Sequence, residues 1–120
     1  MTDQGDREGN YLESSASSLF VYFLAKALNN NYLDASYRET ALKGFEGIIH
    51  NFIKPEEDGT YTITNCCAVA GLGGNGITGH PRDGSFEYYI SEPVIENDPK
   101  STGSFILAAL EIEKLKESIK

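Results

Sequence analysis

The segment LFVYFLAKAL, residues 19–28, carries a single charged side chain, and its apolar side chains point in nearly every direction around a helix. A helix of this kind is normally surrounded by protein. We expect it to begin near Glu13 or Ser14 and to end at Leu28, because the next three residues are asparagines, which favour turns and the left-handed conformation. The sequence therefore predicts a buried helix early in the chain.

A second helix is predicted from Asp34, a good N-cap residue, to Ile53, before Pro55. Its apolar residues recur at spacings of three and four, while its charged residues lie mostly away from that stripe. This helix is therefore amphipathic, with one face in water. Gly44 and Gly47 each lower its intrinsic stability by about 1 kcal/mol relative to alanine, and they indicate close packing.

The last helix is predicted over residues 101–118, after the turn sequence Asn97-Asp98-Pro99. Its first half, FILAAL, is apolar on all sides, and its last turns, EIEKLKESIK, are polar. Two of the three helices thus need cover on most sides, and a lone chain would leave large apolar faces exposed. We expect either self-association through these helices or a larger all-helical domain of which the chain is a part, and we favour the second.

The periodicity changes between the second and third helices. Asp58-Gly59 is a turn signal, and the alternating run TYTITNCC, residues 60–67, predicts a strand. The run SFEYYI, residues 85–90, predicts a second strand that pairs with the first as an antiparallel ribbon. At 120 residues the chain suffices for one domain, residues 1–120, which is mainly α with a small antiparallel β ribbon.

Charge and composition exclude several classes of function. Ten Lys and Arg against eighteen Asp and Glu give a net charge of -8, so the chain lacks a basic stripe for nucleic acid and a polybasic membrane anchor. No apolar run reaches the roughly 18 to 20 residues of a membrane span. The first residues, MTDQGDREGN, do not form a secretory signal. This favours the cytoplasm for this chain and leaves the periplasm open for a longer parent protein.

The cysteines and histidines predict neither a disulfide nor a metal site. Cys66 and Cys67 are adjacent, and neighbouring residues of a strand point to opposite faces, so a disulfide between them would be strained. We expect one to be buried and the other half-buried. His50, near a helix end, and His80, in a loop, are isolated from each other in sequence. No metal and no cofactor is predicted.

The glycine-rich stretch GLGGNGITGHPRDG, residues 71–84, contains a match to G-x-G-x-x-G. That pattern binds dinucleotide phosphates only when a helix opens directly after it, and the continuation ITGHPRDG is not helical. We interpret the stretch as a tightly turned loop that lines a cleft. Arg82 at its end suits a carboxylate, and the aromatic residues that follow suit either sugar rings or the core. Glu92, Glu96 and Asp98 are candidates for a general acid, but in an acidic chain we interpret them by default as solvated carboxylates.

Glu13, Ser14 and Ser15 stand at the start of the first helix and allow two interpretations. They can simply cap the helix. Alternatively, a helix interior to a bundle points its first turn into a cavity, where hydroxyl and amide groups suit a polar or anionic ligand. No serine nucleophile is implied, because the sequence has no G-x-S-x-G elbow.

Four segments, in order along the chain, carry a family resemblance: GNYLESSASSLFVYFLAKA, CCAVAGLGG, RDGSFEYYISEPVIENDPK and STGSFILAALEIEKL. Together they resemble the C-terminal part of the unsaturated rhamnogalacturonyl hydrolases, glycoside hydrolase family 105, which are related to the unsaturated glucuronyl hydrolases of family 88. The resemblance covers residues 3–115. It implies part of a six-hairpin (α/α) barrel, in which the first and third helices are inner helices and the second is an outer one.

The resemblance implies removal of a Δ4,5-unsaturated uronic acid from pectin-derived oligosaccharides by hydration of the double bond. The general acid and base of the family is an aspartate in the N-terminal half of the barrel. This chain matches only the last third of the family's domain, so we expect it to lack that aspartate and assign no catalytic residue. Two alternatives are a non-catalytic carbohydrate-binding or oligomerising helical module, and an enzyme completed by association of several copies.

The resemblance also implies which residues shape the cleft for an oligosaccharide. Glu13, Ser14 and Ser15 match the family's acidic-Ser/Thr motif at the start of an inner helix, which faces the barrel mouth. A second set matches the R-D-G-S-x-E-Y-Y and N-D-x-K segments of the family, and it shapes or supports the cleft: Arg82, Asp83, Tyr88, Asp98 and Lys100.

Overall fold

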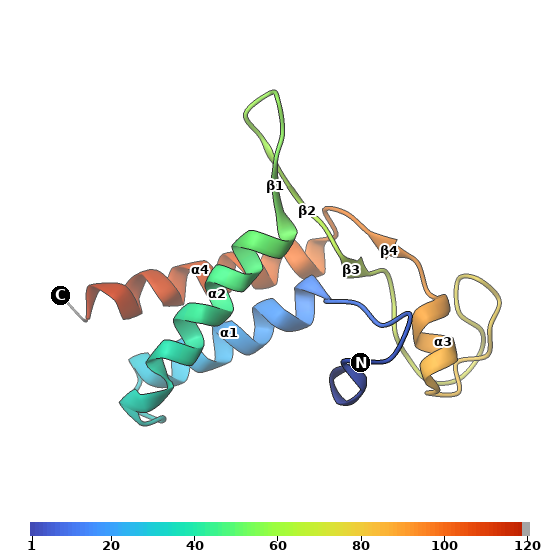
Figure 1. Cartoon of the computed structure of the whole chain (residues 1–120), viewed down its shortest axis with the longest axis horizontal. Coiled ribbons are helices and arrows are strands. Elements are labelled where there is room, and N and C mark those ends of the chain that lie inside the picture. The colour runs from blue at the N-terminus through green and yellow to red at the C-terminus, as the bar shows by residue number, and fades with distance from the viewer. Residues whose placement is uncertain (119–120) are drawn as a thin grey trace.

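The computed structural model describes residues 1–118 and is mainly helical, as predicted (Figure 1). The three long helices are α1 (Ser14–Asn29), α2 (Arg38–Phe52) and α4 (Pro99–Glu117). The shorter elements are the 3-10 turns η1 (Thr2–Gln4) and η2 (Ala35–Tyr37), the helix α3 (Phe86–Ser91) and the strands β1 (Ile53–Pro55), β2 (Tyr61–Ile63), β3 (Cys66–Cys67) and β4 (Val94–Ile95). None of the helices described over residues 1–118 combines the length and hydropathy that crossing a bilayer requires.

Helices α1 and α4 lie side by side and run in the same direction, and α2 runs back across them (Figure 1). Toward the C-terminal ends of the two helices, Asn29 Nδ2 donates a hydrogen bond of 2.9 Å to the carbonyl of Glu111. At the N-terminal ends, both helices are bonded to β3 and the residue after it. Glu13 at the start of α1 accepts the amide of Cys67, and Lys100 at the start of α4 donates to the carbonyl of Ala68. Small side chains are buried along both helices, which suits a close approach of the two backbones: Ser14, Ser18, Ala25, Ser101, Ser104 and Ala108.

The hydrophobic core lies among the three long helices. Phe45 of α2 stacks on Phe105 of α4 with ring centroids 5.9 Å apart. Ile112 and Leu115 of α4 are almost completely buried, each at 1% exposure. The buried apolar residues of this core are Val21, Ala25, Leu28, Ala41, Ile48, Phe52, Ala108, Ile112 and Leu115.

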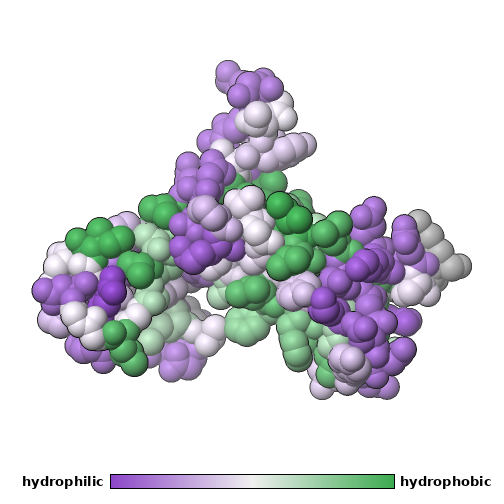
Figure 2. Space-filling view, turned by 180° about the vertical axis from the view of Figure 1, so that it is seen from behind, coloured by the Kyte–Doolittle hydropathy of each residue, from purple (hydrophilic) through white to green (hydrophobic). Residues whose placement is uncertain are grey.

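The outward faces of α1 and α4 carry large apolar side chains in contact with solvent, as predicted for the chain taken alone. Figure 2 shows several hydrophobic patches on one side of the molecule. On α1 the exposed side chains are Leu19, Phe20 and Phe23, and on α4 they are Ile106, Leu107 and Leu110. Each helix therefore buries one side in the core and leaves the other side uncovered.

The second helix starts later than predicted. Asp34 is an N-cap, but it caps the 3-10 turn η2, because its Oδ1 accepts a 2.9 Å hydrogen bond from the amide of Ser36. Helix α2 begins only after this turn, at Arg38. At its other end α2 stops at Phe52, and Ile53 already belongs to β1, which pairs antiparallel with β2.

The predicted strand over residues 85–90 is wrong, because this segment forms helix α3. The reason is capping: Asp83 Oδ1 accepts the amide of Ser85 at 2.9 Å, and Ser85 Oγ accepts the amide of Tyr88 at 3.1 Å. Phe86 and Tyr88 are both buried, and six residues are too few for alternation to distinguish a strand from a helix.

The predicted ribbon is therefore replaced by two small antiparallel pairs. The run over residues 60–67 divides into β2 and β3, separated by Thr64 and Asn65, and the φ of 60° at Asn65 lies in the left-handed region. Strand β2 pairs with β1, and β3 pairs with β4. Cys66 and Cys67 are both free and buried, so the expectation of one half-buried cysteine is wrong as well.

Gly44 lies so close to α1 that a Cβ atom there would be 2.8 Å from Cγ2 of Val21, whereas a Cβ at Gly47 would meet nothing within 4 Å. We expect Gly44→Ala to lower the free energy of unfolding by about 1–2 kcal/mol, because overpacking outweighs the gain in helix propensity. Gly47→Ala, the matched control, should raise it by up to about 1 kcal/mol. Urea denaturation measures both. Equal stabilisation by the two substitutions would contradict the close approach of α1 and α2.

Candidate functional site

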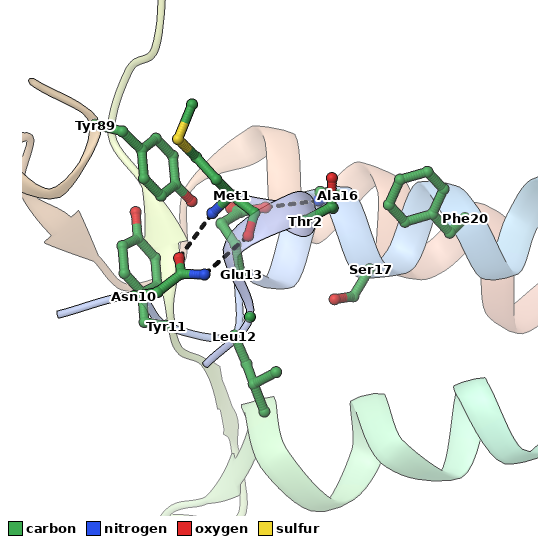
Figure 3. Close-up of a pocket in the computed structure, with 11 residues that line it drawn as sticks. Met1, Thr2, Asn10, Tyr11, Leu12, Glu13, Ala16, Ser17, Phe20 and Tyr89 are labelled. Carbon is green, nitrogen blue, oxygen red and sulfur yellow. Dashed lines mark hydrogen bonds between the residues drawn. The ribbon is translucent and has the colours of Figure 1, made fainter. Parts of the chain in front are cut away.

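A pocket of about 550 Å³ opens beside the first turns of α1 (Figure 3). Its walls come from the N-terminal segment, the start of α1 and helix α3. Volumes of this order are typical of sites that hold a small ligand. Polar, aromatic and apolar side chains line it, among them Asn10, Tyr11, Glu13, Ser17, Phe20 and Tyr89.

Glu13 builds one wall of this pocket through hydrogen bonds to its carboxylate. Its Oε2 accepts the amide of Ala16 at 2.7 Å, which caps α1. Its Oε1 accepts the amide of Cys67 at 3.0 Å, which ties α1 to β3. The hydroxyl of Ser15 donates to the same carboxylate at 2.9 and 3.0 Å. Glu13 is therefore committed to holding the site together.

Three amide groups at the start of α1 are also engaged. Ser14 N donates to the carbonyl of Asn65 at 2.9 Å, and Ser17 N donates to the carbonyl of Glu13 at 3.2 Å. With the amide of Ala16 held by the Glu13 carboxylate, these donors are not available to an anion. Glu13 thus caps α1, as the first interpretation of this motif expects. Ser14 itself is fully buried and does not line the pocket.

Two tyrosines that the sequence did not single out as site residues meet at the pocket. The rings of Tyr11 and Tyr89 are stacked, with centroids 5.4 Å apart and an interplanar angle of 5° (Figure 3). Burial raises the pKa of both phenols, so both rings stay uncharged near neutral pH. Tyr11 precedes α1 and Tyr89 lies on α3, so only the tertiary fold brings them together.

Arg82, Asp83 and Tyr88 do not line this pocket but hold the glycine-rich loop against α3. The hydroxyl of Tyr88 accepts the amide of Gly71 at 3.2 Å, and Asp83 caps the turn that leads into α3. Arg82 Nε lies 3.8 Å from Oε1 of Glu92. These three residues therefore act together, away from the residues at the start of α1.

Glu92, interpreted from the sequence as a solvated carboxylate, is instead fully buried at its side chain. Its Oε2 accepts the amide of Ile77 in the glycine-rich loop at 3.0 Å. Gly76 of that loop leaves no room for a side chain, because a Cβ there would lie 2.9 Å from Cδ of Glu92. The close approach expected of this loop thus occurs, but toward a carboxylate of the same chain.

Asp98 and Lys100 form the start of α4. Asp98 Oδ1 accepts both the amide and the Nζ of Lys100, each at 2.8 Å. Lys100 Nζ also donates to the carbonyl of Ala68 at 3.0 Å, just after β3. The pair therefore anchors the N-terminus of α4 at the same end of the molecule as Glu13.

The hydrogen bonds from the side chain and then the amide of Lys100 lower the pKa of Asp98. With the folded pKa below the unfolded one, its stabilisation is present above the unfolded value and is lost as the pH falls through the folded pKa. We expect Asp98→Asn, which keeps a capping oxygen, to reduce the loss of Tm below about pH 4. Thermal melts at pH 7 and at low pH test this.

Glu113→Gln, which changes an exposed carboxylate on the same helix, is the control for that experiment. It should leave the loss of Tm on acidification close to that of the unmodified chain. An equal acid-induced loss of Tm in Asp98→Asn and the unmodified chain would contradict the lowered pKa of Asp98.

Among the residues that line the pocket, Glu13 is the one with a carboxylate, which accepts hydrogen bonds from Ser15, Ala16 and Cys67. Within residues 1–118, no three His, Cys, Asp or Glu side chains are grouped so that they could hold a metal ion.

The model of Glycosyl Hydrolase Family 88 matches residues 1–116. The chain belongs to this family. The family 88 match confirms the resemblance drawn from the four sequence segments.

Solved structures show the same relationship. The chain is similar to a family 105 glycoside hydrolase from C. acetobutylicum, with 48% identity and a TM-score of 0.87, over 93% of this chain and 30% of that one. A possible family 105 member from Klebsiella pneumoniae, at 24% identity and a TM-score of 0.65, covers 94% of this chain and 25% of its own, and shows the fold alone. The parallel α1 and α4 with α2 between them in sequence are the inner–outer–inner order expected of an (α/α) barrel segment.

Curated relatives of this family 88 chain are Protein Atu3128 of Agrobacterium fabrum and the 24.9 kDa protein in picA locus of Rhizobium radiobacter. Each is 35% identical over 107 residues, which are 86% of this chain and 45% of the relative. The chain thus spans less than half the length of these relatives and about 30% of the C. acetobutylicum hydrolase.

Proposed function

We propose that the chain is the C-terminal part of a glycoside hydrolase that releases Δ4,5-unsaturated uronic acid from pectin-derived rhamnogalacturonan oligosaccharides. The observation that carries this proposal is the similarity to the C. acetobutylicum family 105 hydrolase, at 48% identity and a TM-score of 0.87. The family 88 match over residues 1–116 supports the same reaction class.

In the proposed reaction, hydration adds a proton and a hydroxyl group across the vinyl ether double bond of the unsaturated uronic acid. The resulting hemiketal opens its ring to a ketone and leaves a hemiacetal at C1. This hemiacetal breaks down to an aldehyde and releases the rest of the sugar chain as an alcohol, which takes up the hemiacetal proton. This reaction needs a group that donates and accepts protons. Glu13 is held by three donors, and Asp98 is paired with Lys100, so neither is free for that work. We place the catalytic aspartate outside this chain.

The part played by this chain is then to shape the cleft. Glu13 and Ser15 hold the start of α1, while Asp98 and Lys100 hold the start of α4 at the same end. A second group, from the glycine-rich loop, fixes the loop on α3: Arg82, Asp83 and Tyr88. Each of these contacts is made within the protein, so these residues support the cleft rather than transfer protons.

The test follows the loss of ultraviolet absorbance from an unsaturated rhamnogalacturonan disaccharide. Three proteins are compared: this chain, the complete C. acetobutylicum hydrolase, and a chimera of that hydrolase in which the matching segment is replaced by this chain. We expect no turnover by this chain alone, and turnover by the other two. Turnover by this chain alone would refute the placement of the catalytic aspartate. A complete hydrolase without activity on this disaccharide would refute the proposed substrate.

The apolar side chains exposed on α1 and α4 favour a second candidate, a non-catalytic helical module that binds carbohydrate or associates with itself. Self-association buries these faces, so the average mass from light scattering should rise with concentration. A monomer across the concentration range, together with an active chimera, would eliminate this candidate.

A further inference from the structure

We propose that residues 1–11 and 71–92 together form a cap that opens from the three long helices as one cooperative unit, with Arg7 as the clasp between its parts. The pocket beside α1 lies under this cap, so each opening exposes the pocket. This inference goes beyond the proposed function, because it concerns the dynamics of the fold and does not depend on the reaction.

The cap packs on itself rather than on the long helices. Helix α3 lies apart from α1, α2 and α4 (Figure 1). Its side chains Phe86 and Tyr88 are buried, but they are not part of the core among those helices. Within residues 1–118, none of the hydrogen bonds and ion pairs joins the cap to a long helix. A region with few contacts to the rest of a protein opens at a lower free energy than the core does.

The pocket weakens the boundary between the cap and α1. Residues of the cap line one side of it, among them Asn10, Tyr11 and Tyr89, and residues of α1 line the other, among them Ser17 and Phe20 (Figure 3). A cavity of about 550 Å³ takes the place of packed side chains here, so their dispersion attraction is missing. The cap is therefore held to α1 less firmly than a filled boundary would hold it.

The chain passes between the cap and the rest of the molecule at three points, and all three lie beside the β3–β4 pair. At the first point, the carbonyl of Leu12 accepts a hydrogen bond of 3.2 Å from Nδ2 of Asn65, the residue before β3. The second and third points are bonded to each other, because the amide of Ala68 donates to the carbonyl of Pro93 at 2.9 Å. The cap can therefore leave and return about one place while the long helices stay folded.

Within the cap, residues 1–11 are fastened to α3. The guanidinium carbon of Arg7 lies 4.0 Å from the centroid of the Phe86 ring, and the same guanidinium forms an ion pair with Glu87. The ring of Tyr11 stacks on that of Tyr89, with centroids 5.4 Å apart. These contacts are lost if either part leaves alone, so residues 1–11 and α3 open together.

The glycine-rich loop is fastened to the end of α3 as well. The amide of Ile77 donates to the buried carboxylate of Glu92 at 3.0 Å, and the amide of Gly71 donates to the hydroxyl of Tyr88 at 3.2 Å. A buried polar group that loses its partner costs free energy, so the loop and α3 also open together. The cap is thus one unit made of three segments.

Amide hydrogen exchange, followed by nuclear magnetic resonance on the full chain in urea concentrations below the unfolding transition, measures these openings. The reporters are the amides of Asn10, Ile77 and Tyr89, one from each segment of the cap, and that of Ile112 in the core. We expect the three cap amides to share one urea dependence and to have protection factors at least tenfold below that of Ile112. Protection of Ile77 equal to that of Ile112, or different urea dependences within the cap, would overturn the proposal.

Substitutions test the clasp. Arg7→Ala should lower the protection of Ile77, in a different segment of the cap, by roughly five- to tenfold and leave that of the core amide unchanged. Glu87→Gln, which removes the ion pair from the side of α3, should lower the protection of Asn10 by a smaller factor. The control is Arg38→Ala, at an exposed arginine of α2, which should change neither. An effect of Arg7→Ala on Asn10 without one on Ile77 would overturn the single unit.

Exposure of the pocket is measured by alkylation with iodoacetamide, with the two cysteines distinguished by tandem mass spectrometry. The Cys67 thiol lies beside the Tyr11 phenol of the cap, whereas the Cys66 thiol lies beside Ser101 of α4. In Arg7→Ala, alkylation of Cys67 should accelerate by the factor seen for amide exchange in the cap, and that of Cys66 should not change. Unchanged alkylation of Cys67 would overturn the opening. Neither measurement uses an oligosaccharide, so a failure here leaves the proposed reaction untouched.

Discussion

Replacing Ile112 by alanine is expected to lower the free energy of unfolding by about 3 kcal/mol, and the Tm by roughly 12 °C. Ile112 is 1% exposed and lies in the core that α4 forms with α1 and α2. The substitution removes buried apolar surface and leaves a cavity that the surrounding helices fill only in part. Urea denaturation and a thermal melt measure the two quantities.

Leu110→Ala is the matched control, on the same helix but at 51% exposure. It should change the free energy of unfolding by no more than about 0.5 kcal/mol. A loss in Leu110→Ala as large as that in Ile112→Ala would contradict the exposure of this face. The face would then be buried in solution, as in a self-associated form of the chain.

The second large effect is expected for Glu13→Ala, which should lower the free energy of unfolding by about 2–3 kcal/mol. The substitution removes the cap of α1, and it leaves the amide of Cys67 in the interior without its acceptor. Urea denaturation measures the loss. Hydrogen exchange provides a local measurement, because the amide of Cys67 should exchange faster once the carboxylate is gone.

Ser15→Ala is the control for this effect. It removes one donor to the Glu13 carboxylate but leaves the cap and the bond to Cys67 in place. We expect it to cost less than about 1 kcal/mol. If Glu13→Ala proved no more destabilising than Ser15→Ala, the carboxylate would not be the tie between α1 and β3 that the structure describes.

The helices were predictable from the sequence where their signals are local. Helix α1 lies within one residue of its predicted bounds, because a capping side chain and a run of asparagines mark its two ends. Helix α4 begins at Pro99, two residues before its predicted start, since Asp98 caps it one residue ahead of the proline. Caps and periodicity act within a few residues, so the sequence alone reveals them.

The small elements were not predictable in the same way. The segment over residues 85–90 alternates as a strand does, yet Asp83 and Ser85 start a helix there. Pro55 marked the end of α2 to within one residue, but no local signal showed that residues 53–55 pair with β2 as strand β1. Where a short segment is compatible with two structures, its tertiary partners decide between them.

The residues of the candidate site divide in the same way, into those that a local sequence signal marks and those that only the tertiary structure reveals. Glu13 was identified because its position at a helix start has a meaning in sequence, although its role is structural. Tyr11 lies two residues before Glu13 and Tyr89 lies in the aromatic run after Arg82, but only the fold brings the two rings together. From the sequence, Glu92 is interpreted as a solvated carboxylate of an acidic chain. Only the structure shows that its side chain is buried under the glycine-rich loop.

The parallel course of α1 and α4 has a consequence for how fast the chain reaches its native state. Two parallel neighbours cannot be joined by a tight turn, and the bond from Asn29 to Glu111 links positions 82 residues apart. Ordering so long a connection costs entropy before the contact is made, and high contact order slows folding. Helices α1 and α2 are neighbours in sequence and can meet early. We therefore expect the arrival of α4 to limit the folding rate, with the apolar side of α1 open to aggregation until then.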